Sequence, residues 1–178
     1  MKKMAKRGDV SQVFVYITAV IIFGVVFLFG YRAINHFLEE SDKVGFITFK
    51  TDIESAVRSI KTDFDSATVY AAEKPLRVPP AYTLVCFVDF TDHDVGKPCP
   101  VGLSPAACDT WKTYPSWEET TANVFVTPEG PASIKVSPIK LRDAQGQPVD
   151  HLCIPTRGRL DMRLVGRGSH TLISPLPS

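Results

Sequence analysis

The first part of the chain follows two successive hydrophobic patterns, both typical of helices. From Val10 to Tyr31 no residue is charged and nearly every position is apolar. A helix rises about 1.5 Å per residue, so a run of this length reaches roughly 33 Å and covers a hydrocarbon core of about 30 Å. We therefore predict a transmembrane helix over residues 9–31, preceded by a short basic segment at residues 1–8.

The flanks of the apolar run predict that it is retained, and they predict its orientation. The apolar core of a secretory signal spans about 7–15 residues and is followed by small residues at a cleavage site. Here the run is longer, and Tyr31 and Arg32 follow it. The basic residues before it are Lys2, Lys3, Lys6 and Arg7. They favour a single-pass protein of the cell membrane, with a cytoplasmic N-terminus and an extracytoplasmic C-terminal part.

The second pattern begins after the apolar run. Between Arg32 and Phe64 there is no proline and one glycine, Gly45, and apolar residues recur at spacings of three and four. This stripe consists of Phe46, Phe49, Ile53, Val57, Ile60 and Phe64. We expect an amphipathic continuation over residues 32–66, which packs its stripe on the C-terminal domain and completes one long helix. A separate short helix, joined near Ser41 to Gly45, is the alternative, and a bend near Gly45 is left open.

Beyond residue 67 the pattern changes to short β-like segments separated by turns. All prolines and most glycines follow residue 74, between segments rich in β-branched and aromatic residues. The predicted strands are AYTLVCFVDF, ANVFVT, ASIKVSPIKL and GRLDMRLVG, with HLCIP and HTLIS as shorter ones. The predicted fold class is α+β: a long N-terminal helix packed on a small antiparallel β domain that spans residues 67–178.

One predicted strand alternates clearly between apolar and charged residues. Leu160, Met162 and Leu164 would share one face, opposite Arg159 and Arg163. This is the alternation of an antiparallel sheet with one solvated side. Arg159 and Arg163 are therefore candidates for binding an anionic partner. Solvated edge charges with no partner are the alternative.

Residues 92–121 are rich in proline and cysteine, and we predict a long loop there. A loop of this length usually carries function or is held by cross-links. Its large aromatic residues are Trp111, Tyr114 and Trp117. They either stack on a binding partner or cover a small core.

The four cysteines all lie in the part of the chain that is expected to be exported. An even number of cysteines in that compartment favours disulfides. The pairing Cys99–Cys108 with Cys86–Cys153 is preferred, because the first two cysteines lie in one loop and the others in two strands. The sequence leaves all three pairings open. The spacings lack the short pairs typical of a zinc site.

Motifs that carry chemistry are not found. The formal net charge of +1 gives no general attraction to nucleic acid. The sequence contains no P-loop, no G-x-S-x-G and no H-E-x-x-H. We expect neither an enzyme nor a bound cofactor or metal, and no nucleic acid among the partners.

The order of a basic leader, an apolar helix, an amphipathic continuation and a small β domain resembles type IV pilins, particularly archaeal pilins with class III signal peptides. The resemblance implies that a prepilin-type peptidase cuts between Gly8 and Asp9. Ser11 and Phe14 match the serine and phenylalanine of the Q-x-S-x-E-F pattern that often follows the cut. Asp9 stands where glutamine is usual, and Val13 where the glutamate is usual. The N-terminal half is also similar to uncharacterised archaeal single-pass membrane proteins.

In this family the apolar helices of many subunits pack together and the β domains coat the outside. The resemblance therefore implies a structural subunit (a major, minor or pseudo-pilin) of an archaeal surface filament or a related secretion machine. Its partners would be the membrane and other pilin-like subunits, including copies of itself. Gly24 and Gly30 would allow close helix contact. The alternative is a permanently anchored ectodomain that binds a partner at the cell surface.

Overall fold

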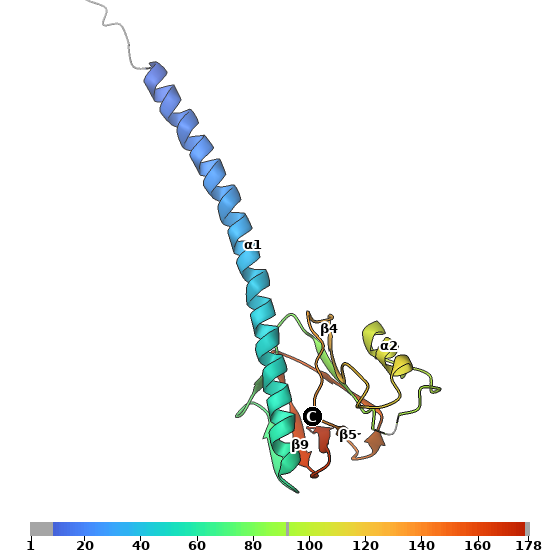
Figure 1. The fold of residues 1–178 in the computed structure, drawn as a ribbon. Coiled ribbons are helices and arrows are strands. Elements are labelled where there is room, and N and C mark those ends of the chain that lie inside the picture. The colour runs from blue at the N-terminus through green and yellow to red at the C-terminus, as the bar shows by residue number, and fades with distance from the viewer. Residues whose placement is uncertain (1–8, 92, 177–178) are drawn as a thin grey trace, which may run out of the picture. The chain divides into compact units, whose positions relative to one another are not determined.

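The computed structural model describes residues 9–91 and 93–176. The chain divides into two compact units, Met1–Ser41 and Asp42–Ser178. Helix α1 (Asp9–Thr62) contributes residues to both units, without a break in its helical assignment (Figure 1). The expected long helix is therefore present, but it ends before the predicted residue 66.

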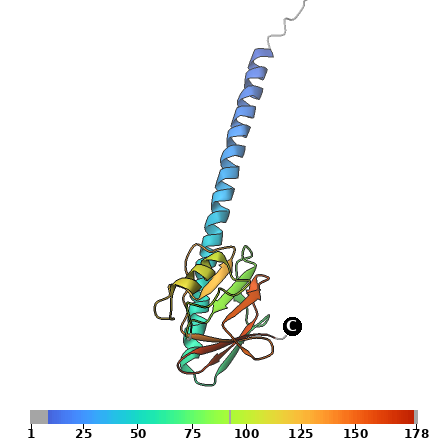
Figure 2. The same cartoon turned by 90° about the vertical axis from the view of Figure 1, so that its right-hand side faces the viewer.

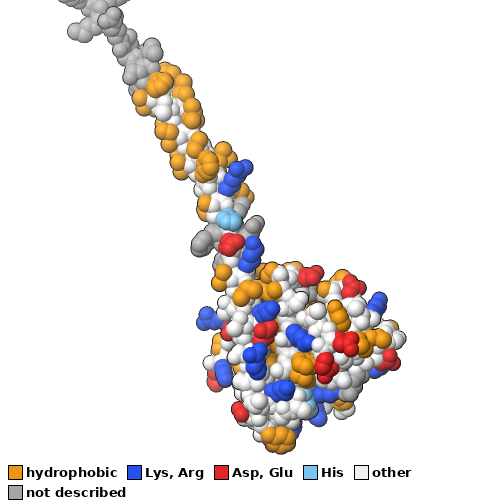
Figure 3. All heavy atoms as spheres, viewed as in Figure 1, with side chains coloured by type: hydrophobic (Ala, Val, Ile, Leu, Met, Phe, Trp, Pro, Cys, Tyr) orange, Lys and Arg blue, Asp and Glu red, His pale blue; other side chains and the backbone are white. Residues whose placement is uncertain are grey.

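In the first unit, the helical residues from Val13 to Ile34 form a stretch that is long and apolar enough to cross a membrane. Residues 9–91 and 93–176 contain no other helix that meets this description. The most apolar part of this stretch has no residue buried inside the protein. Figure 3 shows apolar side chains covering the visible face of this stretch. The prediction of an N-terminal helix of transmembrane length is confirmed.

In the second unit, the remainder of α1 supplies one side of the main hydrophobic core. The predicted stripe is buried at Phe46, Phe49, Ile53, Val57 and Ile60. Phe64 is 74% exposed, so its assignment to the stripe was wrong. The helix ends at Thr62, and the chain then turns at Asp65, which adopts a positive φ of 60°. Phe64 therefore lies in a turn and not on the packed face.

Within residues 67–91 and 93–176, the β domain has ten short strands and one helix (Figures 1 and 2). The strands are β1 (Ala67–Tyr70), β2 (Leu76–Arg77), β3 (Leu84–Val88), β4 (Val124–Thr127), β5 (Ile139–Arg142), β6 (Pro148–Val149), β7 (His151–Pro155), β8 (Arg159–Leu160), β9 (Met162–Gly166) and β10 (Thr171–Pro175). They form sheets with the orders β1-β9-β10-β5-β6, β2-β8 and β4-β3-β7. The pairing of β10 with β5 is parallel and the other named pairs are antiparallel. The α+β fold class is confirmed.

All four longer predicted strands are shorter in the structure, with AYTLVCFVDF and ANVFVT reduced to β3 and β4. The segment GRLDMRLVG divides into β8 and β9, which belong to different sheets. Its alternation is nevertheless present, since Leu160, Met162 and Leu164 are fully buried. In ASIKVSPIKL only β5 is a strand, while Ile134 makes an isolated bridge to Val124.

The predicted loop at residues 92–121 contains a helix, α2 (Pro105–Thr113), which the sequence analysis missed. The Ser104 hydroxyl accepts a hydrogen bond from the backbone N–H of Ala107 at 3.3 Å and caps the first turn. Pro105 follows at the start of the helix, where its missing N–H costs nothing. The segment is therefore a capped helix with flanking loops, not one long loop.

The end of α1 lies very close to strand β9. A Cβ atom built on Gly166 would overlap the backbone carbonyl oxygens of Ile60 and Asp63. The backbone N–H of Asp65 donates to the Gly166 carbonyl at 2.9 Å. Because only glycine leaves room for this approach, Gly166 fixes how the helix end packs on the five-stranded sheet.

Candidate functional site

The apolar helix is the first candidate site. Phe14 and Val20 are more than two-thirds exposed. A Cβ atom built on Gly24 or on Gly30 would meet no other atom within 4 Å. These residues thus present a surface with no protein partner inside the described chain. Gly8 and the side chains of Asp9 and Ser11, on which the predicted cleavage and assembly motif also rests, lie outside the residues that the structure describes.

Both disulfides join residues of the β domain. Cys86 of β3 is bonded to Cys153 of β7, its direct partner in the sheet register. Cys99 is bonded to Cys108 of α2. This is the pairing that the sequence analysis preferred. The second bond ties the segment before α2 to the helix itself.

Trp111 was predicted either to contact a partner or to cover a small core, and its burial favours the second role. Its side chain is 1% exposed and packs with Val88 and Phe90 in a small second core. The indole N–H donates to the Lys97 carbonyl at 3.3 Å. The indole packs on Val88 at the end of β3 and on Phe90, which follows that strand. Trp111 covers a small core, which was the alternative to partner binding in the sequence analysis.

The other aromatic candidates lie nearer the surface. Trp117 is half-buried, and its indole N–H donates to the Val136 carbonyl at 2.9 Å. The ammonium of Lys135 lies 4.7 Å from the centre of the Trp117 ring. Tyr114 is half-buried at the C-terminal cap of α2. Nothing in their contacts shows what they bind.

The two candidate arginines do not form one stripe. Arg159 lies on β8 in the two-stranded sheet and pairs with Asp161, with Nε and Oδ1 2.9 Å apart. Arg163 lies on β9 and lines a hollow of about 370 Å³ together with Arg142 and Arg167. Asp65 and Asp143 line the same hollow, so Arg163 belongs to a mixed group of charges that Arg159 does not join.

The second candidate site is a larger cavity of about 590 Å³ next to that hollow, with Arg142, Arg167 and Leu172 lining both. Its lining comes from β5, β6 and β10, from residues that follow β3, from the connection between β9 and β10, and from Trp111 of α2. We call it the β5–β10 cleft. Its charged and imidazole residues are Asp89, His93, Lys97, Lys140, Arg142, Asp150, Arg167 and His170.

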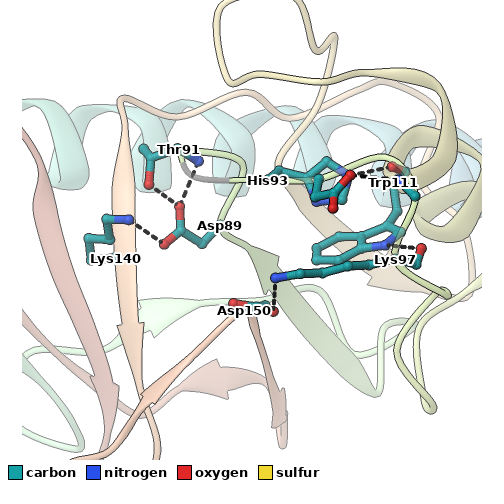
Figure 4. A network of polar contacts seen from close by, with 9 residues as sticks. Asp89, Thr91, His93, Lys97, Trp111, Lys140 and Asp150 are labelled. Carbon is teal, nitrogen blue, oxygen red and sulfur yellow. Dashed lines mark hydrogen bonds and ion pairs between the residues drawn. The ribbon is translucent and has the colours of Figure 1, made fainter.

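Asp89 holds one wall of the β5–β10 cleft in place. Its side chain is 10% exposed, and one carboxylate oxygen accepts from the N–H of Thr91 at 2.8 Å and from its hydroxyl at 2.5 Å. The other oxygen lies 3.3 Å from the ammonium of Lys140. Figure 4 shows this network. Because the carboxylate is satisfied on both oxygens, Asp89 positions Lys140 beside the cleft.

His93 is fixed against α2 and leaves one nitrogen unused. Its Nε2 atom lies 2.6 Å from the Trp111 carbonyl oxygen, and the two rings are 3.9 Å apart between centres (Figure 4). Since a carbonyl oxygen only accepts, Nε2 carries the proton. The Nδ1 atom is buried. Among the side chains that the structure describes, it is the one buried polar atom without a hydrogen-bond partner. In the neutral imidazole it is an acceptor without a donor.

The charge in the β5–β10 cleft is predominantly positive. Lys97 and Asp150 form a long, exposed ion pair of 3.8 Å, which is worth little in water. His170 is half-buried, and burial, followed by the nearby Lys140 and Arg167 cations, lowers the pKa of its imidazole, while Asp89 acts in the opposite direction. The cleft lining thus contains more cationic than anionic side chains.

Sequence reasoning missed the β5–β10 cleft. Asp89 and His93 lie in the segment DFTDHDVG, to which the sequence analysis assigned no role. The usable signal was the position of that polar run directly after a buried strand, where loops often carry function. Across residues 9–91 and 93–176, no three His, Cys, Asp or Glu side chains gather closely enough to hold a metal ion.

No protein-family model, no curated protein and no solved structure matches the chain.

Proposed function

We propose that this protein is a structural, pilin-like subunit of an archaeal surface filament or a related secretion machine. The observation that carries the proposal is the stretch from Val13 to Ile34, which is apolar and exposed on all sides. It belongs to the same helix as the stripe from Phe46 to Ile60, which forms the core of the β domain. One helix thus combines an unpartnered apolar segment with a firmly packed one.

A helix that is apolar all round is stable only in lipid or among other apolar helices. Inside a membrane, lipid surrounds it. In a filament, the same segments of neighbouring subunits replace the lipid, and the polar β domains face water. The protein supplies both parts of this arrangement, and the basic leader with Gly8, Ser11 and Phe14 supports it through the resemblance stated above.

The proposal includes the partners and the location. A prepilin-type peptidase removes residues 1–8, and the mature helix then associates with other pilin-like subunits. Before assembly the protein is a single-pass membrane protein with its N-terminus in the cytoplasm and its disulfide-bonded domain outside. It acts as a structural protein, not as an enzyme, and uses no cofactor.

Cross-linking of the full chain in membranes tests self-association. A Val20→Cys variant places a thiol on the exposed apolar helix, while the four natural cysteines are paired and do not react. We expect a thiol-specific bifunctional reagent to give a ladder of dimers and larger species. The control Val101→Cys places a thiol on a 96% exposed residue of the β domain and should give far fewer. Monomers alone for Val20→Cys would contradict the proposal.

A second candidate function is favoured by one observation, the β5–β10 cleft. Its size falls in the range of about 300–1,000 Å³ that is usual for ligand pockets. A permanently anchored ectodomain that binds a surface partner would use such a cavity and would keep its leader. Retention of Lys2 to Gly8 in the native protein would favour this function over the filament subunit.

A further inference from the structure

The hollow of about 370 Å³ that Arg163 lines is a surface feature that the filament proposal does not require. We call it the β9–β10 hollow. Its charged lining residues are Arg142, Arg163, Arg167, Asp65 and Asp143. What it can bind depends on which of these charges are already paired within the chain.

The register of the five-stranded sheet places two arginines on either side of a serine. Leu141 of β5 pairs with Ile173 of β10, and both are buried. Side chains alternate along a strand, so the residues that follow them, Arg142 and Ser174, lie on the opposite face. Ser174 in turn pairs with Arg163 of β9. Since neighbouring strands are about 4.8 Å apart, the two arginine backbones are about 10 Å apart, with the serine between them.

Neither of these arginines is paired in the part of the chain that the structure describes. Among residues 9–91 and 93–176, the side chains of Arg142 and Arg163 form no ion pair and no hydrogen bond. The Asp65 carboxylate is taken up by Arg167, with oxygen and nitrogen 2.8 Å apart. The Asp143 carboxylate accepts from two backbone N–H groups of its own turn, at 3.0 and 2.8 Å. The carboxylates of the hollow therefore leave both guanidinium groups available to an external anion.

The donors around the β9–β10 hollow suit an anion with more than two oxygens. Each guanidinium group presents paired N–H donors that match two oxygens. Ser174 is half-buried and lines the same hollow, and its hydroxyl can donate between the two arginines. Two such pairs and a hydroxyl exceed the two oxygens of a carboxylate, whereas a phosphate group presents at least three.

We propose that the β9–β10 hollow binds a phosphate group, which Arg142 and Arg163 hold from two sides and the Ser174 hydroxyl holds between them. A phosphate monoester carries nearly two negative charges at neutral pH, so two unpaired guanidinium groups suit it. The volume of the hollow falls within the range of about 300–1,000 Å³ that is usual for ligand pockets. It therefore has room for the organic part of an ester as well as for the free ion.

Calorimetric titration of the full chain in micelles of a phosphate-free detergent tests the proposal, with inorganic phosphate and glycerol 3-phosphate as probes. Acetate is the comparison, because it is an anion with only two oxygens. An ionic strength of about 0.15 M screens general attraction between separated exposed charges. We expect both probes to bind, and acetate to bind more weakly by about a factor of ten or more. Tighter binding of glycerol 3-phosphate would identify an ester as the source, and tighter binding of inorganic phosphate the free ion.

Substitutions separate the proposed contacts from the general charge of the surface. Arg142→Gln and Arg163→Gln should each weaken phosphate binding by about a factor of ten or more, because each removes a charge-assisted pair of donors. Ser174→Ala removes a neutral donor and should weaken binding by a smaller factor, about two to ten. Arg157→Gln removes the same charge from an exposed residue outside the hollow and should leave phosphate binding unchanged.

A further control distinguishes the β9–β10 hollow from the β5–β10 cleft beside it. Arg163 lines the hollow alone, and Lys97 lines the cleft alone. Lys97→Gln should therefore leave phosphate binding unchanged. Arg163 is exposed and unpaired in the described structure, so its substitution should not disturb folding, which unfolding curves will verify. Three results would overturn the proposal: no binding of either probe, acetate binding as tight as phosphate binding, or equal losses for Arg163→Gln and either control variant.

Discussion

Two stretches of helix α1 both contain large apolar residues, yet these residues are arranged differently. From Val13 to Ile34 the apolar residues cover all sides and are exposed. From Phe46 to Ile60 they form one stripe, and that stripe is buried against the β domain. The difference shows that apolar content alone does not build a core; a one-sided pattern does.

The two stretches also bury their apolar side chains in different ways. The stripe of the second stretch is buried within the chain and contributes to the folding free energy of the β domain. The apolar side chains of the first stretch are buried only by something outside the chain, which is either lipid or other helices. Substitutions in the two stretches should therefore have different consequences, and the following predictions separate them.

The largest expected effect is the loss of a buried aromatic side chain from the stripe. Phe49→Ala should lower the free energy of unfolding of the β domain by about 3–5 kcal/mol, because it leaves a cavity in the core. The matched change in the exposed stretch, Phe23→Ala, should leave that free energy unchanged. Denaturant unfolding followed by tryptophan fluorescence measures both. Equal losses for the two variants would contradict the claim that only the second stretch stabilises the β domain.

The next effect concerns the bond between β3 and β7. A Cys86→Ser/Cys153→Ser double variant should lower the stability of the β domain by about 2–4 kcal/mol, because the unfolded chain gains freedom. The apolar stretch of α1 carries no cysteine and should keep its helical structure. Intact mass after alkylation without reductant tests the bonds themselves. Four alkylated thiols in the native protein would show that neither disulfide forms.

A smaller effect is expected at the close contact between α1 and β9. Gly166→Ala should destabilise the β domain by about 1–3 kcal/mol, because its methyl group would meet the carbonyls of Ile60 and Asp63. Gly24→Ala meets no atom of the chain and serves as the matched control. Thermal unfolding of the two variants gives the answer. If Gly166→Ala melted like the unsubstituted protein, the described packing of the helix end would be wrong.

The smallest effect is a dependence of stability on pH. Burial lowers the pKa of His170 in the folded protein, so the unfolded chain binds the proton more readily. Stability should therefore be greatest above the ordinary histidine pKa of about 6.5 and should fall as the pH drops from there toward the lower folded pKa. His170→Gln should flatten this part of the curve. A steeper fall in that variant would contradict the sign.

Much of the fold follows from local pattern. The spacing of Phe46, Phe49 and Ile53 places one helix face in the core, and alternation at Leu160, Met162 and Leu164 places one strand face there. Both patterns arise from side-chain periodicity, which neighbours in sequence determine. Phe64 fits the helical period equally well, but the helix ends before it. The period alone does not predict where a helix ends.

Helix α2 and the short strands were harder to predict. Ser104 and Pro105 are a recognised helix start, but prolines and cysteines around them suggested a loop. Strands β2, β6 and β8 contain two residues each, too few for any alternation to show. Of these, β6 pairs with the longer β5, whereas β2 and β8 pair with each other.

The β5–β10 cleft depends on contacts between distant parts of the chain. Its Asp89–Lys140 pair joins residues that follow β3 to β5, and β5 lies parallel to β10 in the sheet. Nothing in the local sequence around Arg142 indicates that it lacks a partner, or around His93 that its Nδ1 is buried without one. These are properties of the packed structure, whereas the apolar helix is visible from composition alone.

The most direct test of the central claim, the pilin-like function, is the mass of the N-terminal peptide of the native protein taken from its own membranes. The account predicts a mature chain that begins at Asp9, since prepilin-type processing would remove residues 1–8. A chain that retains Lys2 to Gly8 would contradict it, and the apolar stretch would then be a permanent anchor for the β domain.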